Sequence, residues 1–182
     1  MDLGNNIEWE ILIDAINFYK LKGFEFVNLD WTVPPKISNI TIPVGRKNFF
    51  INEKVLVASG EQSFLNMIVN NNLKPGKYVG ITPCFRDEPI LDELHKSYFM
   101  KVELIDTLRA DSLNNMIQSA KEFYLKYLDV SVIETQDEMY DIEDTKNRIE
   151  LGSYGTRRYK NIEYVFGTGC ALPRLTYAIN LQ

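Results

Sequence analysis

The chain has 182 residues, of which 45% are hydrophobic and 25% are charged, which is the composition of an ordinary globular protein. At a typical length of ~150 residues per domain, we expect a single domain over residues 1–182 with one compact core. Twenty basic and 25 acidic residues give a formal net charge of −5, which excludes a protein that coats nucleic acid with a generally basic surface.

Four segments show the apolar spacing of amphipathic helices. They are residues 8–21, 60–69, 112–128 and a segment that begins near 173. Gly23 ends the first helix as a C-cap glycine, and Ser59 with Gln62 three residues later fits a capping box for the second. Asp111 is the expected N-cap of the third helix, and Pro173 is tolerated in the first turn of the fourth.

Alternation of apolar and polar residues and strand-like composition predict strands between these helices. They are residues 24–29, 49–58, 78–85, 98–105, 131–134, 139–142, 148–151 and 162–166. Because these strands do not alternate strictly with helices, we expect an α+β fold, in which an antiparallel sheet is flanked by helices.

The cysteines and the first residues of the chain indicate in which cellular compartment the protein is found. Two cysteines, Cys84 and Cys170, cannot form a disulfide framework for a chain of this length, so we expect free buried thiols. The first ten residues contain neither a cationic start nor an apolar stretch, and no apolar run reaches the ~20 residues of a membrane-spanning helix. We therefore expect a cytoplasmic protein with no membrane partner.

A polar cluster follows the strand over 78–85 and continues on the strand over 98–105. If these two strands are antiparallel neighbours, alternation places Arg86 and Glu88 on the same face as Phe99, Lys101 and Glu103. An arginine, two carboxylates and an aromatic ring suit a ligand that carries a phosphate, an ammonium group and a flat base. The alternative is a surface hairpin with cross-strand ion pairs.

Two further clusters carry chemistry. Residues 167–174 combine glycines, which let the backbone approach a ligand, with Arg174 in the first turn of a helix, where an anion can bind. Glu150 and Ser153 are oxygen donors three residues apart and can share a magnesium ion. Ordinary turns at the ends of strands are the alternative explanation for both clusters.

In this order and spacing, the segments resemble the catalytic core of the class II aminoacyl-tRNA synthetases over about residues 8–182. The second of the three motifs of that class is matched by Phe85-Arg86-Asp87-Glu88, His95, Phe99 and Glu103. The third is matched by Gly169, Arg174 and Leu175, and the helix with residues 23–27 and Pro34 resembles the first. The similarity is greatest to the seryl-tRNA synthetase branch, through residues 82–86, 101–104, 140–143 and 167–174.

The resemblance implies that ATP binds in a bent form across the sheet. Arg86 is expected to bind the α-phosphate and His95 the γ-phosphate. Phe99 and Arg174 are expected to hold the adenine between them, with Arg174 also near the γ-phosphate. Glu150 and Ser153 are expected to hold magnesium, so that Glu150 belongs to the ATP site, and Arg86 and Arg174 are the expected catalytic residues.

The resemblance also implies an amino-acid site. Glu88 is expected to bind the amino group, together with Ser59 and Glu61 at the position of a Thr-x-Glu signature. Glu103 is expected to contact the side chain of the substrate, and Thr168 to complete the site.

Two residues set this chain apart from the seryl branch. Phe166 and Tyr154 stand where that branch has polar residues. They argue against serine as the substrate and favour a less polar side chain.

The implied activity is that of a ligase: ATP-dependent activation of an amino acid to an aminoacyl-adenylate, then transfer to tRNA or to a non-tRNA acceptor such as a carrier protein. A loop of only ten residues between Glu88 and Phe99, and the lack of a coiled-coil arm, lead us to expect weak binding of tRNA. The alternatives are a non-catalytic sensor of an amino acid or ATP, and an amidating ligase that resembles ammonia-dependent asparagine synthetase. The first motif implies a homodimer.

Overall fold

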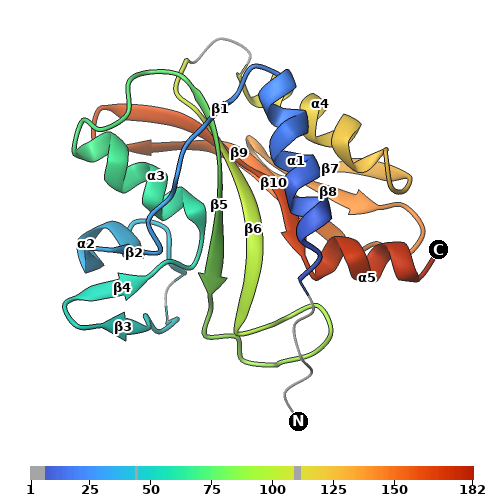
Figure 1. The fold of residues 1–182 in the computed structure, drawn as a ribbon, viewed down its shortest axis with the longest axis horizontal. Helices are drawn as coiled ribbons and strands as arrows, with labels where there is room; N and C mark the ends of the chain where they lie inside the picture. The colour runs from blue at the N-terminus through green and yellow to red at the C-terminus, as the bar shows by residue number, and fades with distance from the viewer. Residues whose placement is uncertain (1–6, 44, 109–111) are drawn as a thin grey trace.

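The computed structural model describes residues 7–43, 45–108 and 112–182. In these ranges, the chain forms one large sheet with the strand order β1-β5-β6-β10-β9-β8-β7 (Figure 1). The strands are β1 (Glu25–Phe26), β5 (Lys77–Phe85), β6 (Tyr98–Asp106), β7 (Val130–Gln136), β8 (Met139–Asp144), β9 (Glu150–Tyr159) and β10 (Ile162–Leu172). All neighbouring pairs are antiparallel except β1 and β5, so the expected antiparallel α+β architecture is confirmed with one short parallel pair.

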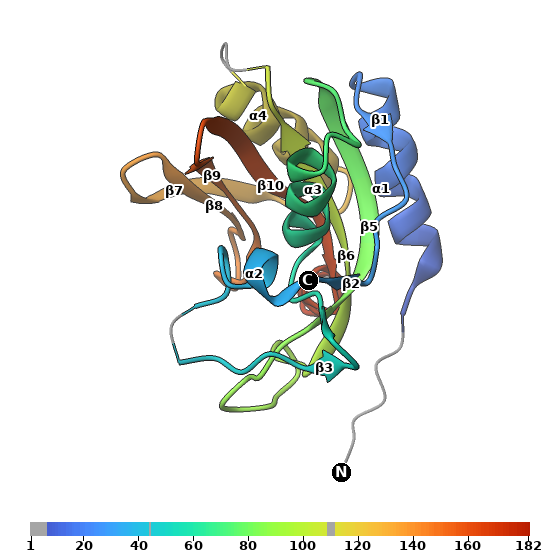
Figure 2. The ribbon, with the colours of Figure 1, turned by 90° about the vertical axis from the view of Figure 1, so that its left-hand side faces the viewer.

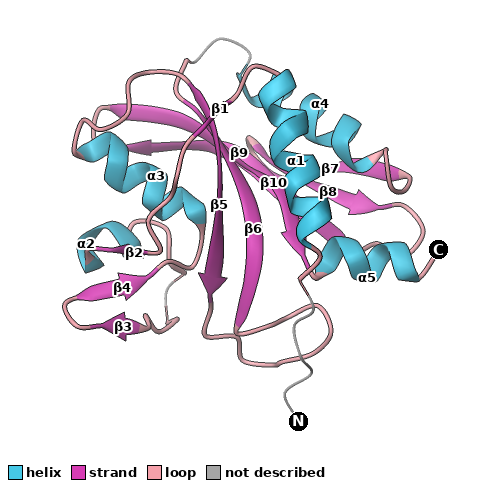
Figure 3. Ribbon diagram, in the orientation of Figure 1, coloured by secondary structure: helices cyan, strands magenta, loops and turns pink. Residues whose placement is uncertain are grey.

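Helices cover both faces of this sheet (Figures 2 and 3). They are α1 (Trp9–Leu21), α2 (Pro35–Ser38), α3 (Gly60–Val69), α4 (Ser112–Tyr124) and α5 (Arg174–Asn180). Alternation along β6 separates two cores: Val102 and Leu104 pack in one with residues of α1 and α4, and Ile105 packs in the other with residues of α3. The β6 face that carries the odd-numbered residues therefore meets the N-terminus of α3, and the polar cluster lies on that face.

A small second sheet corrects the prediction for residues 49–58. Instead of one strand, this segment is a hairpin of β3 (Phe50–Ile51) and β4 (Lys54–Leu56), and β4 also pairs with β2 (Thr32–Val33). The chain reverses at Asn52, whose φ of 54° is one that asparagine tolerates better than most residues. Likewise, only Glu25–Phe26 of the strand expected over 24–29 form strand β1, and the amide of Val27 adds one hydrogen bond to the carbonyl oxygen of Val79.

The strands β9 and β10 are longer than predicted, because their glycines are strand residues rather than turn residues. A Cβ on Gly167 would lie 2.4 Å from Cδ1 of Tyr154, and one on Gly152 would lie 2.8 Å from Cβ of Thr168. These glycines make room for neighbouring side chains within the sheet. The alternative explanation of residues 167–174 as an ordinary turn is therefore wrong for residues 167–172, which belong to β10.

The ends of the helices follow the sequence signals in part. Gly23 has the positive φ, 86°, of a C-terminal glycine, but α4 ends at Tyr124 and not at Leu128. Leu128 is nevertheless buried, so the apolar pattern continues past the last helical residue. Asp111, the expected cap of α4, lies outside the described residues.

Both cysteines are free and buried, as expected. Burial raises the pKa of Cys84 to about 12, so its thiol stays protonated at neutral pH. None of the helices in the described part of the chain is long and apolar enough to cross a membrane.

Candidate active site

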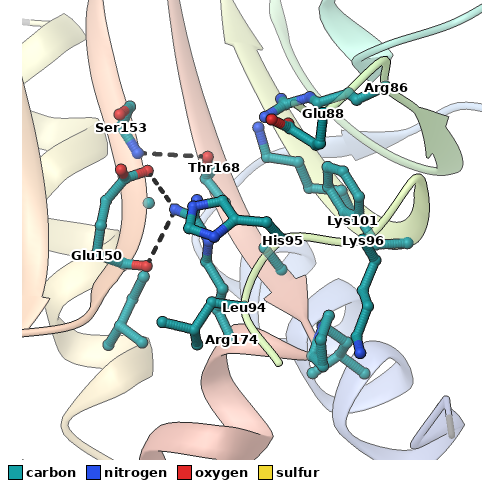
Figure 4. Close-up of a pocket in the computed structure, with 16 residues that line it drawn as sticks. Arg86, Glu88, Leu94, His95, Lys96, Lys101, Glu150, Ser153, Thr168 and Arg174 are labelled. Atoms are coloured by element: carbon teal, nitrogen blue, oxygen red, sulfur yellow. Dashed lines mark hydrogen bonds and ion pairs between the residues drawn. The ribbon is translucent and has the colours of Figure 1, made fainter. Parts of the chain in front are cut away.

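Two adjoining cavities open on the sheet face that carries Phe99, Lys101 and Glu103. The first has a volume of about 130 Å³ and lies between the segment that follows β5, strands β9 and β10, and the start of α5 (Figure 4). The second has a volume of about 300 Å³ and lies beside the N-terminus of α3. Among the described residues, four line both cavities: Arg86, Glu88, Lys101 and Ser153.

Arg86 is held at the boundary between the cavities. Its Nε donates to the carbonyl oxygen of Ala58 at 3.1 Å, and its guanidinium lies 5.0 Å from the centre of the Phe99 ring. Arg86 and Phe99 are therefore on one face, as the alternation argument requires. The neighbouring Glu88 is 3.5 Å from Nη2 of Arg46. A cation and a carboxylate thus stand side by side where the two cavities meet.

In the first cavity, Arg174 and Glu150 contact each other (Figure 4). Nη1 of Arg174 lies 2.8 Å from Oε1 of Glu150 and donates to the carbonyl oxygen of the same residue at 3.3 Å. On the same strand, the amide of Ser153 donates to Oγ1 of Thr168 at 3.4 Å.

Ser153 contacts Asp141, a residue that was not predicted from the sequence. The hydroxyl of Ser153 donates to Oδ1 of Asp141 at 2.5 Å. Burial raises the pKa of Asp141, an effect that the Ser153 bond opposes and the nearby Glu150 carboxylate reinforces. Asp141 lies in the stretch 140–143 that resembles the seryl branch, and this stretch was the signal that could have identified it.

These donors fit a magnesium ion that is shared with a phosphate ligand. The described residues contain no group of three or more His, Cys, Asp or Glu residues that could hold a metal alone. Magnesium, however, is usually bound by one or two protein oxygens, with water and substrate phosphates as the other ligands. Glu150 and Ser153 supply such oxygens on one strand, with Asp141 behind them.

His95 lies in the loop that closes the first cavity, next to Lys96 (Figure 4). Its Nδ1 is 2.9 Å from Oδ1 of Asp92, and the backbone amide of His95 donates to the same oxygen at 2.7 Å. Asp92 therefore orients the imidazole. Lys96 was not predicted, and it adds a cationic group to this wall.

In the second cavity, Glu103 is tied to the start of α3. Ser59 caps this helix by accepting from the amide of Glu61 at 3.2 Å, and its hydroxyl donates to Oε1 of Glu103 at 2.5 Å. The amide of Gly60 donates to the same oxygen at 3.1 Å, and Nζ of Lys101 is also 3.1 Å away. A Cβ on Gly60 would lie 2.8 Å from Cγ of Glu103, so this position requires glycine.

Glu61 is paired with an arginine that the sequence analysis missed. Nη1 of Arg157 donates to both carboxylate oxygens of Glu61, at 2.8 and 2.6 Å, and the hydroxyl of Tyr164 donates at 2.9 Å. Burial raises the pKa of Glu61, and Arg157 offsets part of this effect. Alternation along β9 from Ser153 would have placed Arg157 on the same face.

The two aromatic residues that favoured a less polar substrate do not form an apolar wall. Tyr154 is fully buried, lines neither cavity and donates its hydroxyl to the carbonyl oxygen of Thr168 at 2.6 Å. Phe166 does line the second cavity, but the guanidinium of Arg157 lies 4.1 Å from the centre of its ring. The expectation of a less polar substrate side chain stays a prediction, but these two residues give it little support, because Tyr154 lies outside the cavities and a charged group lies over the Phe166 ring.

The structure divides the predicted site residues between the two cavities. The first is lined by Arg86, Glu88, His95, Phe99, Glu150, Ser153, Thr168 and Arg174. The second is lined by Ser59, Glu61, Arg86, Glu88, Glu103 and Ser153. All of them therefore lie in one continuous region, and only Thr168, expected in the amino-acid site, falls on the side of the expected ATP site.

No protein-family model and no curated protein sequence matches this chain. Solved structures do match. A pyrrolysyl-tRNA synthetase from Desulfitobacterium hafniense is 14% identical with a TM-score of 0.75, over 96% of this chain and 69% of that one. The seryl-tRNA synthetase of Pyrococcus horikoshii, complexed with ATP, is 20% identical with a TM-score of 0.71, over 93% of this chain and 48% of that one.

A third match is the cytoplasmic serine-tRNA ligase of Naegleria fowleri in complex with AMP, 17% identical with a TM-score of 0.68, over 93% of this chain and 47% of that one. The chain thus spans about half the length of the two seryl enzymes. At these identities the likeness concerns the fold. The chain has the fold of the class II aminoacyl-tRNA synthetase catalytic domain, and the seryl branch is among its structural matches.

Proposed function

We propose that this protein is a ligase that activates an amino acid with ATP. The supporting observation is that two cavities, one for each substrate, share the wall formed by Arg86, Glu88, Lys101 and Ser153. The first cavity receives ATP and the second receives the amino acid. The carboxylate of the amino acid and the α-phosphate then meet at the shared wall.

The reaction needs no nucleophile from the protein. A carboxylate oxygen of the amino acid attacks the α-phosphorus, a P–O bond forms, and the bond to pyrophosphate breaks with its electron pair. Arg86, held by Ala58 and Phe99, presents a fixed positive charge to the phosphate oxygens, while Glu88 binds the ammonium group. Alignment and positive charge together lower the barrier.

The remaining predicted residues hold the two substrates. Arg174 and Phe99 contact the adenine, and His95 contacts the terminal phosphate. Glu150 and Ser153 hold magnesium, which neutralises phosphate charge when it is bound. On the other side, Ser59, Glu61 and Glu103 shape the amino-acid site.

The aminoacyl group then passes to an acceptor, either tRNA or a non-tRNA acceptor such as a carrier protein. The protein acts in the cytoplasm as a homodimer. Trp9 and Ile13 support the dimer, because each is 54% exposed on the outer side of α1.

The test is the amino-acid-dependent exchange of pyrophosphate into ATP, measured with each of the twenty amino acids and magnesium. We expect exchange with at least one of them, and a loss of about 100-fold or more in Arg86→Ala, because one electrostatic contact to a developing charge contributes about 3 kcal/mol. Arg158→Ala is the matched control, since Arg158 is exposed on β9 and lines neither cavity.

Failure of all twenty amino acids with folded, magnesium-loaded protein would overturn the proposal. Binding of ATP or an amino acid without exchange would identify a sensor instead. Release of AMP that depends on ammonia would identify an amidating ligase.

A further inference from the structure

The second cavity ends at an arginine for which the proposed reaction gives no role. Arg157 lies on β9 four residues beyond Ser153, which is about 13 Å along an extended strand from the wall that the two cavities share. Its side chain is 37% exposed and lines only the second cavity. The site therefore carries a cation at the end far from the expected phosphates.

The guanidinium of Arg157 is held from two sides. The centre of the Phe166 ring lies 4.1 Å from the guanidinium, and the carboxylate of Glu61 accepts two hydrogen bonds from it. The Glu61 side chain is only 6% exposed and is further fixed by Tyr164. Such supports hold a planar group in one orientation, as a recognition site for a specific ligand requires.

The pairing with Glu61 leaves some N–H donors of the Arg157 guanidinium for a ligand. Both bonds to Glu61 come from Nη1, and Arg157 also interacts with the hydroxyl of Tyr164, so the remaining N–H groups of its guanidinium are the donors that a ligand could use. The fork of an arginine matches the two oxygens of a carboxylate. An apolar substrate side chain here would leave these donors without water or an acceptor, which is costly, and a cationic one would be repelled.

Several other charged groups of this cavity are already engaged: Arg46 lies 3.5 Å from Glu88, whereas Lys47 also lines the cavity and no ion pair of its side chain is seen among the described residues. Glu103 is bonded to Ser59, Gly60 and Lys101, and Glu88 is expected to take the ammonium group of the substrate. The α-carboxylate faces Arg86 at the shared wall. Because Glu61 is paired with Arg157, we assign the ammonium group to Glu88 and not to Glu61, and the side chain of the substrate then points toward Arg157.

We infer that Arg157 recognises a carboxylate at the end of the substrate side chain, so that the amino acid activated is a dicarboxylic one, aspartate or glutamate. The inference rests on the proposed function and specifies its substrate class. It also gives a role to the Arg157 guanidinium that lies over the Phe166 ring, a ring that was expected to favour a less polar substrate.

The test compares amino acids and variants in the pyrophosphate exchange assay. Aspartate or glutamate is expected to support exchange, with asparagine, glutamine and serine at least about 100-fold lower in kcat/KM, because a site built to bind a charged partner through hydrogen bonds rejects analogues that lack it. Arg157→Gln is expected to raise KM for the active amino acid by about 100-fold, with little change in the affinity for ATP, measured separately by calorimetry.

Because Arg157→Gln leaves Glu61 buried without its cation, the double variant Glu61→Gln/Arg157→Gln is measured as well. It is expected to fold and to show the same loss for the dicarboxylic substrate. Arg158→Gln, on the adjacent exposed position, is the control and should leave KM unchanged.

Exchange that is supported by a neutral amino acid as well as by aspartate and glutamate, or better, would overturn the inference and leave the proposed function standing. An unchanged KM in the folded double variant would also overturn it. Failure of all twenty amino acids would overturn both.

Discussion

Nη1 of Arg174 lies 2.8 Å from Oε1 of Glu150. Arg174, which is expected to contact the adenine, therefore forms an ion pair with Glu150, which is expected to hold magnesium. The two come from different elements, α5 and β9, and meet across the first cavity. The Glu150 side chain is nevertheless 43% exposed. The Glu150 carboxylate would therefore be accessible to hold a magnesium ion, and Arg174 would then be available to contact the nucleotide.

The first prediction concerns this pair. Glu150→Gln keeps an acceptor for Arg174 but removes the charge that favours magnesium. We expect the magnesium concentration for half-maximal ATP binding to rise by about 10-fold or more, measured by calorimetry at several magnesium concentrations. Glu134→Gln, at an exposed position on β7, serves as the control. An unchanged magnesium dependence in Glu150→Gln would remove this residue from the metal site.

Pairs such as this one mark the limit of what the sequence can predict. Closeness in the sequence indicated that Glu150 and Ser153 can share an ion, and alternation grouped Arg86 with Phe99. The register shift between β8 and β9 at this point, which the sequence did not indicate, interrupts the regular alternation between the two residues. The position of Asp141 did not follow, because this residue is on β8 and reaches the site only through the order of the strands in the sheet. No local pattern encodes that order. Arg157 was missed for a different reason, since the strand expected over 148–151 ended before it.

The fold shows a related limit. The helices α1 and α3 began and ended near their expected residues, since cap signals are local. The strand expected over 162–166 was too short, because a glycine that avoids a clash with a neighbouring strand looks the same in sequence as a glycine that turns the chain. Only the contact of Gly167 with Tyr154 distinguishes the two.

The second prediction tests the cap of α3. Ser59→Ala removes an acceptor for the amide of Glu61 and a donor to Glu103. We expect the free energy of unfolding in urea to fall by about 1 kcal/mol, the usual cost of losing an N-cap. Ser59→Thr should retain most of the stability, and Ser119→Ala, on the exposed side of α4, should change little. Equal stability of Ser59→Ala and the original chain would contradict the capping role.

The third prediction concerns pH. Burial raises the pKa of Asp14, but the bonds from Lys126 and Tyr127 outweigh burial, and the pKa lies below its usual value. Because the pKa is lower in the folded than in the unfolded state, Asp14 stabilises the fold above the unfolded pKa of about 3.9. This contribution is lost as the pH falls through the folded-state pKa.

Asp14→Asn should therefore be less stable than the original chain at pH 7, and the difference should shrink as the pH is lowered below about 4. Urea unfolding at a series of pH values measures this difference. Asp137→Asn, at an exposed position, provides the comparison. A difference that stays constant from pH 7 to pH 3 would show that the charge of Asp14 contributes nothing.

The fourth prediction concerns assembly. Trp9 and Ile13 are four residues apart and lie on the same exposed side of α1. Sedimentation should give twice the monomer mass of 21.1 kDa, and Ile13→Glu should shift the protein toward the monomer. Lys20→Glu, also exposed on α1, should not do so. A monomer at high concentration would refute the dimer.

The last prediction assigns a role to Lys101, which lines both cavities and is only 13% exposed. Its Nζ lies 3.1 Å from Oε1 of Glu103, and it stands with Arg86 at the shared wall. We expect Lys101→Met to lower kcat of the exchange reaction by about 100-fold, because a preorganised cation acts mainly on the developing charge, with a smaller change in KM for ATP. Lys101→Arg should recover part of the rate.

A purely structural role for Lys101 predicts a different outcome. If this lysine only neutralises Glu103, then Lys101→Met/Glu103→Gln should restore kcat, since Ser59 and Gly60 still bond to the amide that replaces the carboxylate. If the lysine acts on the phosphate, the double variant should remain about as slow as Lys101→Met. Urea unfolding of both variants separates a loss of stability from a loss of rate, and restored turnover in the double variant would exclude a catalytic role.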